Sequence, residues 1–356
     1  MADEHGRQQP RTGPKAPPPQ EFKRIYPTLY IGLGGTGKEI ILRLRRRILQ
    51  TLWSGKRIES LEEFPVASFL YFDTLSGKAE DENRARQDSR GAIHDPLLRL
   101  VELSPSDCVQ EENFAPEKYI SEIERHPHIQ EWLPPGDLNA IDIEKGAGQV
   151  RPAARLLFFH EALRLNNAIN EKARTLLHNV GNEERLRTLG LEIEPEVKIV
   201  VLCSLAGDTG SGVFLDMGYL CKSLQNPRPK EVVLYGLLGG PFEGLNLRVL
   251  ANTYAALAEL EYCMRSSRKD AYVKTWFPGL SNEALRPYDE VYLIDNANFG
   301  NQRTGERRHL YGMIADILFE ELHDPVLRGK RREDLVNQKQ YKPVSYTHLR
   351  AHETGR

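Results

Sequence analysis

Two glycine-rich segments constrain the fold of this chain more than any other feature. The first, GLGGTG at 32–37, closes the apolar run TLYIGL at 28–33, and the second, GDTGSG at 207–212, follows the apolar run VKIVVLC at 197–203. Each segment leads into residues with apolar side chains at helical spacing. A short apolar run that ends in glycines before a helix is typical of a buried strand in an α/β domain. The pair therefore predicts two strand–loop–helix units in one sheet.

The rest of the chain continues this alternation of strands and helices. Further strands are expected at 66–72, 231–238 and 290–294, and helices at about 39–52, 152–179, 212–225, 246–265 and 307–322. Strands that alternate with helices favour an α/β fold with a mostly parallel sheet. The strands are apolar without a period of two, which is typical of a sheet covered by helices on both faces. We therefore predict that architecture.

Composition excludes several classes of protein. The 356 residues carry a formal net charge of −2, whereas a dedicated nucleic-acid-binding protein is usually clearly basic. No apolar run reaches the roughly 18 residues of a membrane-spanning helix, and the polar N-terminus has no signal peptide. The cysteines lie far apart and form no CxxC pattern, so we expect neither a zinc site nor disulfides. These features indicate a reduced, cytoplasmic protein without a nucleic-acid partner.

The composition along the chain predicts its domain organisation. Residues 1–24 are rich in proline and charge and are expected to be disordered. Residues 25–330 form one domain, in which 76–145 is an insertion with several prolines and, we expect, short helices rather than sheet. Residues 331–356 are a polar tail. Within it, 345–356 (SYTHLRAHETGR) resembles translated sequencing-adapter sequence and is expected to be non-native.

The first glycine segment alone is compatible with three kinds of phosphate loop. Gly32, Gly34 and Gly37 match the GxGxxG pattern of dinucleotide-binding proteins, and Gly32 to Lys38 nearly match a P-loop. Glu39, however, stands where a P-loop needs Ser or Thr to hold Mg²⁺. The third possibility is the first phosphate loop of a tubulin-type protein. In all three, glycines let the backbone approach phosphate oxygens, and N–H groups at the helix N-terminus face the anion.

The second glycine segment distinguishes between these possibilities. A dinucleotide-binding or P-loop protein has no need of a second phosphate loop in the same sheet. The segment SLAGDTGSG at 204–212 resembles the GGGTGSG and GGGTGTG signature of the tubulin and FtsZ superfamily. Asp208 stands where that signature usually has glycine. The chain looks most similar to the bacterial tubulin-like proteins, and the resemblance extends over about 25–322.

The resemblance implies a site for GTP and Mg²⁺. Asp73 would lie beside Mg²⁺, Glu243 near the ribose and Asn296 on the guanine edge, since an amide both donates and accepts hydrogen bonds. The residues implied at the phosphates come from three loops: Gly34, Gly35, Thr36 and Gly37; Gly146, Ala147 and Gly148; and Gly207, Asp208, Thr209, Gly210, Ser211 and Gly212.

The resemblance also implies partners. Proteins of this superfamily assemble head to tail with copies of themselves, and hydrolysis needs an acidic residue from a loop that follows the helix expected at 307–322. This chain turns polar soon after that helix. We therefore expect GTPase activity and filament formation only in a longer parent protein.

Two other interpretations stay open at this point. An NAD(P)-linked oxidoreductase would use the first glycine segment, but Asp73 follows it later than that fingerprint requires, and the second glycine segment has no role. A scaffold of tubulin fold that no longer binds nucleotide is motivated by Glu39 and Asp208. Arg155 is a candidate phosphate ligand or a surface residue. The cluster of arginines at 43–47 is expected on a solvated helix face.

Overall fold

A parallel sheet forms the centre of the molecule. The computed structural model describes residues 23–64, 66–74, 101–109, 114–133, 150–178, 183–239, 247–265, 286–296, 306–323 and 346–350. The strands of the main sheet lie in the order β11 (Tyr346–Arg350), β10 (Glu290–Asp295), β9 (Glu231–Leu237), β8 (Lys198–Ser204), β2 (Thr28–Leu33), β5 (Ala67–Phe72) and β6 (Cys108–Val109). Every pair in this order is parallel, so the carboxyl ends of the strands lie along one edge.

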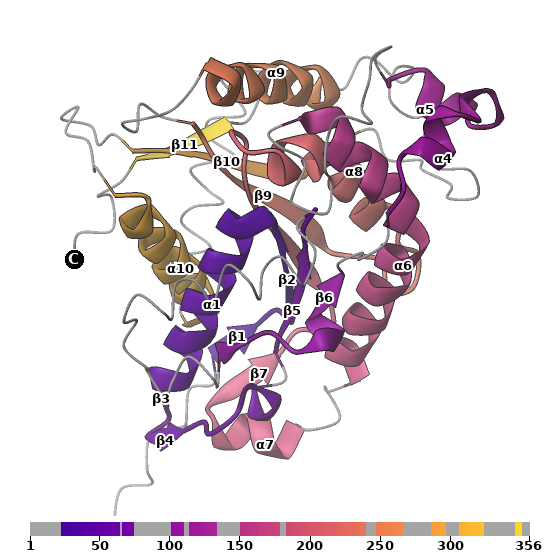
Figure 1. The fold of residues 1–356 in the computed structure, drawn as a ribbon. Helices are drawn as coiled ribbons and strands as arrows, with labels where there is room; N and C mark the ends of the chain where they lie inside the picture. The colour runs from indigo at the N-terminus through magenta and orange to yellow at the C-terminus, as the bar shows by residue number, and fades with distance from the viewer. Residues whose placement is uncertain are drawn as a thin grey trace, which may run out of the picture.

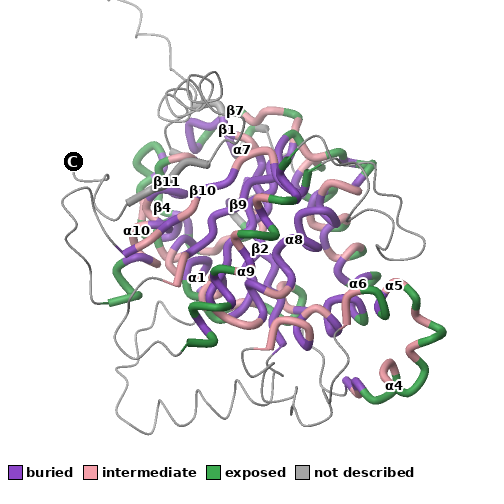
Figure 2. Tube along the Cα trace, turned by 90° about the horizontal axis from the view of Figure 1, so that it is seen from above, coloured by how far each residue is buried: buried purple, intermediate pink, exposed green. Residues whose placement is uncertain are grey.

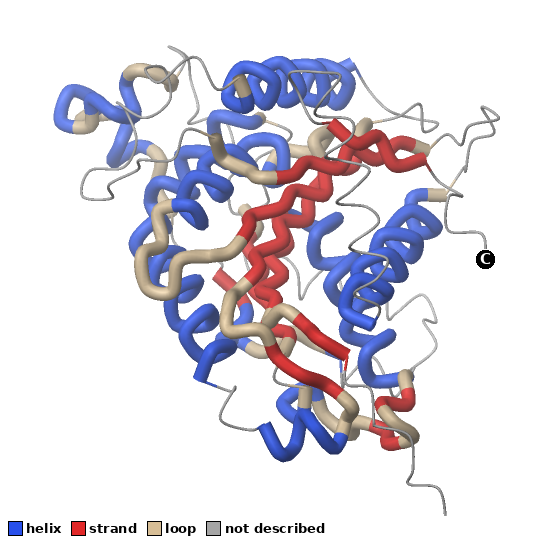
Figure 3. The backbone as a smooth tube through the Cα atoms, turned by 180° about the vertical axis from the view of Figure 1, so that it is seen from behind, coloured by secondary structure: helices blue, strands red, loops and turns tan. Residues whose placement is uncertain are grey.

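Helices cover both faces of the sheet (Figures 1 and 3). On one face, α1 (Gly34–Gln50) packs against α10 (Arg307–His323). On the other face lie α6 (Arg151–His178), α8 (Thr209–Lys222) and α9 (Leu247–Met264).

Strand β2 contributes side chains to the hydrophobic cores on both faces of the sheet. Leu29, Ile31 and Leu33 belong to the core shared with α6 and α8, whereas Tyr30 belongs to the core shared with α1 and α10. All these side chains are buried, which explains the apolar run without alternation. Figure 2 shows buried residues concentrated in the central strands and exposed residues on the outer helices.

The predicted strands agree with the observed ones to within a residue, and the predicted helices are all present. The largest difference is at α1, which begins at Gly34 rather than near Glu39, so residues 34–37 of the first glycine segment form the first turn of the helix. The start was misplaced because glycine has a low intrinsic helix propensity. Here the backbone conformation is set by packing against the neighbouring strands.

The insertion at 76–145 is only partly described. It contains the short helices α4 (Glu117–Ile120) and α5 (Pro127–Gln130), together with the 3-10 turns η2 (Pro105–Asp107) and η3 (Ile123–Arg125). The expectation that it adds no strand is wrong for β6, which pairs with the end of β5. Val109 is buried in the core beneath α6, and this burial holds the two-residue strand in place.

Several short elements had no counterpart in the sequence analysis. Strands β1 (Lys23–Ile25) and β7 (Leu191–Ile193) form a separate parallel pair, and β3 (Leu52–Trp53) and β4 (Lys56–Arg57) form an antiparallel one. The others are helix α7 (Glu183–Thr188) and the 3-10 turn η1 (Leu61–Glu63). Strand β11 lies within the tail at 345–356 and pairs with β10. Within the described residues, no helix combines the length and apolar character needed to cross a membrane.

The arginine cluster of α1 was expected to lie on a solvated helix face. The structure shows that one of these arginines, Arg45, is buried. Its guanidinium donates to the Glu102 carbonyl oxygen over 2.8 Å and lies 3.5 Å from an Asp107 carboxylate oxygen. Burial lowers the pKa of Arg45, and Asp107 opposes that effect. The expectation of a solvated face is therefore wrong at this position, because the segment at 101–109 covers it.

Candidate functional site

Three loops meet at the carboxyl edge of the sheet. Strand β2 lies between β5 and β8, and Leu33 at its end pairs with both Phe72 and Cys203. The two glycine segments and the residues after β5 therefore leave the sheet side by side. In open α/β sheets, ligands bind outside the carboxyl ends of the strands.

Two glycines of the first segment let strand and helix approach closely. A Cβ atom on Gly37 would lie 2.5 Å from the Leu202 carbonyl oxygen and 2.6 Å from Gly32 Cα. A Cβ atom on Gly32 would in turn lie 2.8 Å from the Gly37 carbonyl carbon. Real Cβ atoms do not approach backbone this closely, so packing within the protein alone requires glycine at both positions.

Two glycines of the second segment serve the same purpose. A Cβ atom on Gly210 would lie 2.4 Å from the Ser204 carbonyl oxygen. One on Gly212 would lie 2.7 Å from the Arg151 carbonyl oxygen, at the start of α6. These glycines seat α8 against β8 and α6.

Gly35 and Gly207 differ from these packing glycines. Among the residues that the structure describes, a Cβ atom at either position would meet nothing within 4 Å. Neither backbone adopts a positive φ, whereas Gly34 has a φ of 67° and requires glycine for that reason. Nothing in the described protein explains why Gly35 and Gly207 lack side chains. Both lie at the edge where the two glycine segments meet.

Thr209 joins the three loops. Its hydroxyl donates to Asp73 Oδ1 over 2.6 Å and lies 2.8 Å from the Thr74 hydroxyl oxygen. Its Cβ atom lies 3.3 Å from the position of a Cβ on Gly34. The structure thus brings together Asp73, Thr209 and Gly34, three residues that the sequence analysis assigned to one site from three different segments.

The carboxyl group of Asp73 is buried and accepts three hydrogen bonds. Tyr71 donates to Oδ2 over 2.6 Å, and the Thr74 N–H donates to Oδ1 over 2.7 Å. Burial raises the pKa of Asp73, the hydrogen bonds from Thr209, Tyr71 and Thr74 oppose this, and the charge of Asp208 adds to it. The hydrogen bonds therefore hold the Asp73 carboxyl group in a fixed position next to Thr209.

Asp208 caps helix α8. Its Oδ1 accepts a hydrogen bond from the Thr209 N–H over 2.7 Å, which satisfies one of the free donors at the helix N-terminus. The departure from the glycine of the superfamily signature thus has a structural role.

Two residues that sequence reasoning did not assign to the site support the second loop. The Arg151 guanidinium donates to the Ser211 carbonyl oxygen through Nε over 3.0 Å and through Nη2 over 2.9 Å. Asn252 of α9 donates to the Gly207 carbonyl oxygen over 3.3 Å. The Ser211 hydroxyl also donates to the Gly207 carbonyl oxygen, so its oxygen remains available as an acceptor. No local pattern in the sequence marks these long-range contacts.

Three further candidates have defined positions. The Thr36 hydroxyl oxygen lies 3.5 Å from the Tyr311 hydroxyl oxygen of α10. The Lys38 ammonium lies over the Tyr71 ring, 5.0 Å from its centroid. Asn296 directly follows β10, three strands from β2 on the same sheet edge, and it is buried. Asn296 is therefore placed along the edge from the glycine loops rather than beside them.

Arg155 does not reach this edge as a free cation. Both arms of its guanidinium bind the buried carboxylate of Asp216 in α8. Its role as a candidate phosphate ligand is therefore wrong, because Asp216 already neutralises it.

Some predicted site residues lie outside the described residues: Gly146, Ala147, Gly148 and Glu243. Among the residues that are described, no group of three or more His, Cys, Asp or Glu side chains is arranged to hold a metal ion. Asp73 and Asp208 lie on either side of Thr209 and supply carboxylate oxygens, the ligand type that Mg²⁺ prefers. Because Mg²⁺ is usually held by one or two carboxylates together with substrate phosphates and water, this donor set fits Mg²⁺ bound with a nucleotide.

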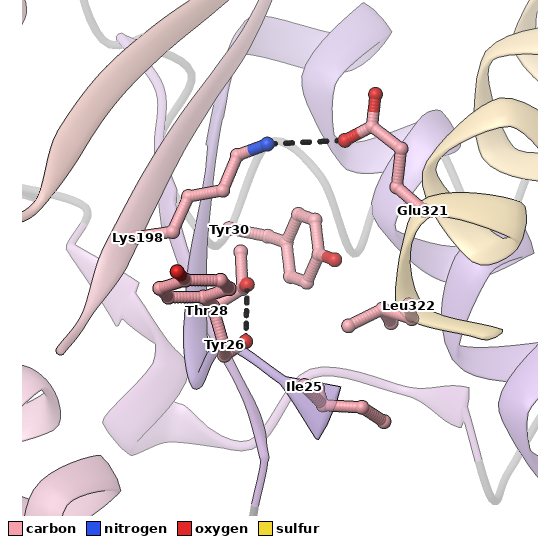
Figure 4. Close-up of a pocket in the computed structure, with 7 residues that line it drawn as sticks. All are labelled: Ile25, Tyr26, Thr28, Tyr30, Lys198, Glu321 and Leu322. Atoms are coloured by element: carbon pink, nitrogen blue, oxygen red, sulfur yellow. Dashed lines mark hydrogen bonds and ion pairs between the residues drawn. The ribbon is translucent and has the colours of Figure 1, made fainter. Parts of the chain in front are cut away.

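A separate pocket lies at the opposite, amino edge of the sheet (Figure 4). In it the Lys198 ammonium forms an ion pair with Glu321 of α10 over 3.0 Å and lies 3.5 Å from Glu231. Tyr235 donates to the second oxygen of Glu321 over 2.6 Å. This buried charge cluster joins the sheet to α10. The residues that line the pocket are Ile25, Tyr26, Thr28, Tyr30, Lys198, Glu321 and Leu322.

Comparison with known proteins identifies the class to which this fold and site belong. The sequence profile of the family described as "Tubulin like" matches residues 29–350, which is most of the chain. The chain therefore belongs to the tubulin-like family, and the predicted α/β fold of tubulin/FtsZ type is confirmed. This assignment sets aside the dinucleotide-binding oxidoreductase. No curated protein matches the chain.

Two of the solved structures that are similar to this chain are CetZ proteins. CetZ from Methanosaeta thermophila strain DSM 6194 has 15% sequence identity and a TM-score of 0.39, over 82% of this chain and 52% of that chain. CetZ2 from Haloferax volcanii, as a GTPγS-bound protofilament, has 14% identity and a TM-score of 0.43, over 83% of this chain and 57% of that chain. This chain thus spans just over half the length of these structures.

Proposed function

We propose that this chain binds GTP together with Mg²⁺ at the carboxyl edge of its sheet. The observation that carries the proposal is the pair of open glycines, Gly35 and Gly207, on two loops that meet at Thr209. The packing glycines are explained by the protein itself, but these two are not. Glycine without a steric reason within the protein is typical of a backbone that a ligand approaches closely. Membership of the tubulin-like family supports phosphate as that ligand.

The proposed roles follow the loops. Backbone N–H groups at the starts of α1 and α8 would bind the phosphates, where the partial positive charge of a helix N-terminus favours anions. Asp73 would hold Mg²⁺, whose charge would offset that of the phosphates. Glu243 would lie near the ribose, and Asn296 would bind the guanine edge. The residues that this proposal places around the phosphates and their Mg²⁺ are Gly34, Gly35, Thr36, Gly37, Gly146, Ala147, Gly148, Gly207, Asp208, Thr209, Gly210, Ser211 and Gly212.

Head-to-tail self-assembly and GTP hydrolysis are the wider activity that we propose for the full parent protein. In an interface that joins two different surfaces of identical chains, open filaments result when the rotation does not close. Sedimentation of the full parent protein with GTP, and with GDP as the control, tests assembly. Pelleting that depends on GTP would support it, and pelleting that is equal in both nucleotides would argue against it.

The open glycines allow a direct test of the binding site. Gly35→Ala and Gly207→Ala place a methyl group in space that the described residues leave open, so folding stability should hold or rise by about 0.4–1 kcal/mol. If phosphates approach these positions, the same methyl groups should weaken GTP binding at least tenfold in calorimetric titration with Mg²⁺. Folding and binding would then change in opposite directions.

Gly312→Ala is the matched control. Gly312 lies within α10, and a Cβ atom there also meets no described residue within 4 Å. This variant should bind GTP like the unmodified chain. If the chain binds GTP and all three variants retain its affinity, the phosphates do not lie between the two glycine loops. If the chain binds neither GTP nor ATP, a scaffold of tubulin fold without nucleotide is the better description.

A further inference from the structure

Asp208 places a negative charge where a phosphate would otherwise find donors. Its carboxylate oxygen accepts from the Thr209 N–H over 2.7 Å at the start of α8, a helix of 14 residues. The N-terminus of such a helix attracts anions through its free N–H groups and its dipole. In this chain a side chain of the protein already uses one of these N–H groups.

A second carboxylate lies on the other side of the same residue. The Thr209 hydroxyl donates to Asp73 Oδ1 over 2.6 Å, so the backbone donor and the side-chain donor of Thr209 are both held by carboxylates. The two carboxylates are close enough for the charge of Asp208 to act on Asp73. A polyphosphate that enters between the glycine loops therefore approaches the Asp208 carboxylate, and the buried Asp73 carboxyl group lies on the other side of Thr209.

We propose that Asp208 makes phosphate binding at the second glycine loop strictly dependent on a divalent cation. The inference rests on the proposed function and concerns the selectivity of the same site. Without a cation, the phosphates face the Asp208 carboxylate directly, and like charges at contact distance repel each other. With a cation, carboxylate and phosphate oxygens share one positive ion. A glycine at this position, as in the superfamily signature, would impose no such requirement.

Asp208→Asn isolates the charge. Asparagine is as good an N-cap as aspartate, so its side-chain oxygen retains the bond to Thr209 N–H while the negative charge is lost. Asp208→Gly removes both the charge and the cap. Glu196→Gln is the matched control, because it removes one negative charge at the opposite edge of the sheet, where Glu196 pairs with Lys230.

Affinity for GTP and for inorganic pyrophosphate is measured by calorimetric titration of the full chain, once with Mg²⁺ and once with EDTA. For the unmodified chain and Glu196→Gln, EDTA should weaken GTP binding at least a hundredfold. For Asp208→Asn and Asp208→Gly, the loss should shrink to about tenfold or less, and both should bind pyrophosphate in EDTA at least tenfold more tightly than the unmodified chain. Melting temperatures without ligand provide a readout independent of binding, and that of Asp208→Asn should be unchanged.

The outcomes separate this inference from the proposed function. If the unmodified chain binds GTP with Mg²⁺ but Asp208→Asn shows the same loss in EDTA, the inference is overturned and the proposed function stands. If the unmodified chain binds GTP equally well with Mg²⁺ and with EDTA, the inference is likewise overturned and the proposed function stands. If no protein binds GTP in either buffer, the proposed function fails and this inference fails with it.

Discussion

Arg155 and Asp216 form a two-bond ion pair between α6 and α8. Arg155 Nε donates to Asp216 Oδ2 over 2.9 Å, and Nη2 donates to Oδ1 over 3.0 Å. Asp216 is completely buried, and the guanidinium of Arg155 also lies over the Trp132 ring, 4.4 Å from its centroid. The pair is therefore part of the packing between two helices on the same face of the sheet.

Removal of the arginine should destabilise the fold rather than the site. Arg155→Ala leaves the Asp216 carboxylate buried without its partner, and the free energy of unfolding should fall by about 3–5 kcal/mol. Arg155→Lys should restore only part of this, because an ammonium group does not reproduce the two parallel bonds of a guanidinium. Urea denaturation measures both. If Arg155→Ala leaves stability unchanged but weakens GTP binding, Arg155 is instead a phosphate ligand.

Alanine substitution at a packing glycine should lower the free energy of unfolding, in contrast to alanine substitution at an open glycine. In Gly210→Ala the new Cβ atom would lie 2.4 Å from the Ser204 carbonyl oxygen, so helix and strand must move apart. Overpacking of this kind costs about 1–3 kcal/mol of unfolding free energy. Gly207→Ala, three residues away, meets no such contact and is the comparison in the same denaturation series. Equal stability of the two variants would contradict this division of the glycines.

Asn296 provides a test of base selectivity. If its amide binds the guanine edge, Asn296→Ala should reduce the preference for GTP over ATP by about tenfold or more, as expected for one lost and unreplaced hydrogen-bonding group. Competition between the two nucleotides measures this ratio directly. Asn170→Ala is the control, since the Asn170 amide bonds only locally to Asn166 within α6. A preference unaltered by Asn296→Ala would place the base elsewhere.

Glu290 should make stability depend on pH. Burial raises its pKa, the charges of Glu231 and Glu321 add to this, and Lys198 and a hydrogen bond from Tyr292 oppose it. The folded state therefore holds the proton of Glu290 to a higher pH than the unfolded state does. The contribution of Glu290 to the free energy of unfolding should be greatest in acid. It should fall as the pH rises from the ordinary glutamate pKa through the raised pKa of Glu290 in the folded state.

Glu290→Gln tests this dependence. Glutamine remains neutral, so the variant should be more stable than the unmodified chain at pH 7 and should lack this part of the decline. Urea denaturation between pH 4 and pH 8 provides the comparison. A variant that is less stable at pH 7 and keeps the same pH profile would show that another group is responsible.

The long elements of the fold could be predicted because each contains enough apolar residues to show its period. Strand β8 and helix α6 are examples, and both agree with the expected ranges to within a residue or two. The pairs β1–β7 and β3–β4 could not be predicted, since two or three residues show no period and depend on distant partners. Arg45 was misjudged for the same reason, because the segment that covers it is remote in the sequence.

The loops of the candidate site could be predicted because glycine patterns mark them. The contacts that other helices make with these loops could not be predicted. Asp73 and Thr209, which were assigned to one site from separate segments, are joined by a hydrogen bond, because parallel strands bring their carboxyl ends to one edge. Sequence alone did not separate Gly35 and Gly207 from glycines that are required only by packing. That separation depends on which backbone atoms surround each position. Arg151 and Asn252 were missed because their contacts to the second loop come from other helices.

The backbone contact between Gly32 and Gly37 affects how the first loop would bind a ligand. Because strand and helix touch there without side chains between them, the shape of the first loop is determined by the folding of the sheet itself. The conformational entropy of ordering that loop is then lost when the chain folds, and not again when a ligand arrives. Such a loop is preorganised, and the affinity of the site depends mainly on charge and fit.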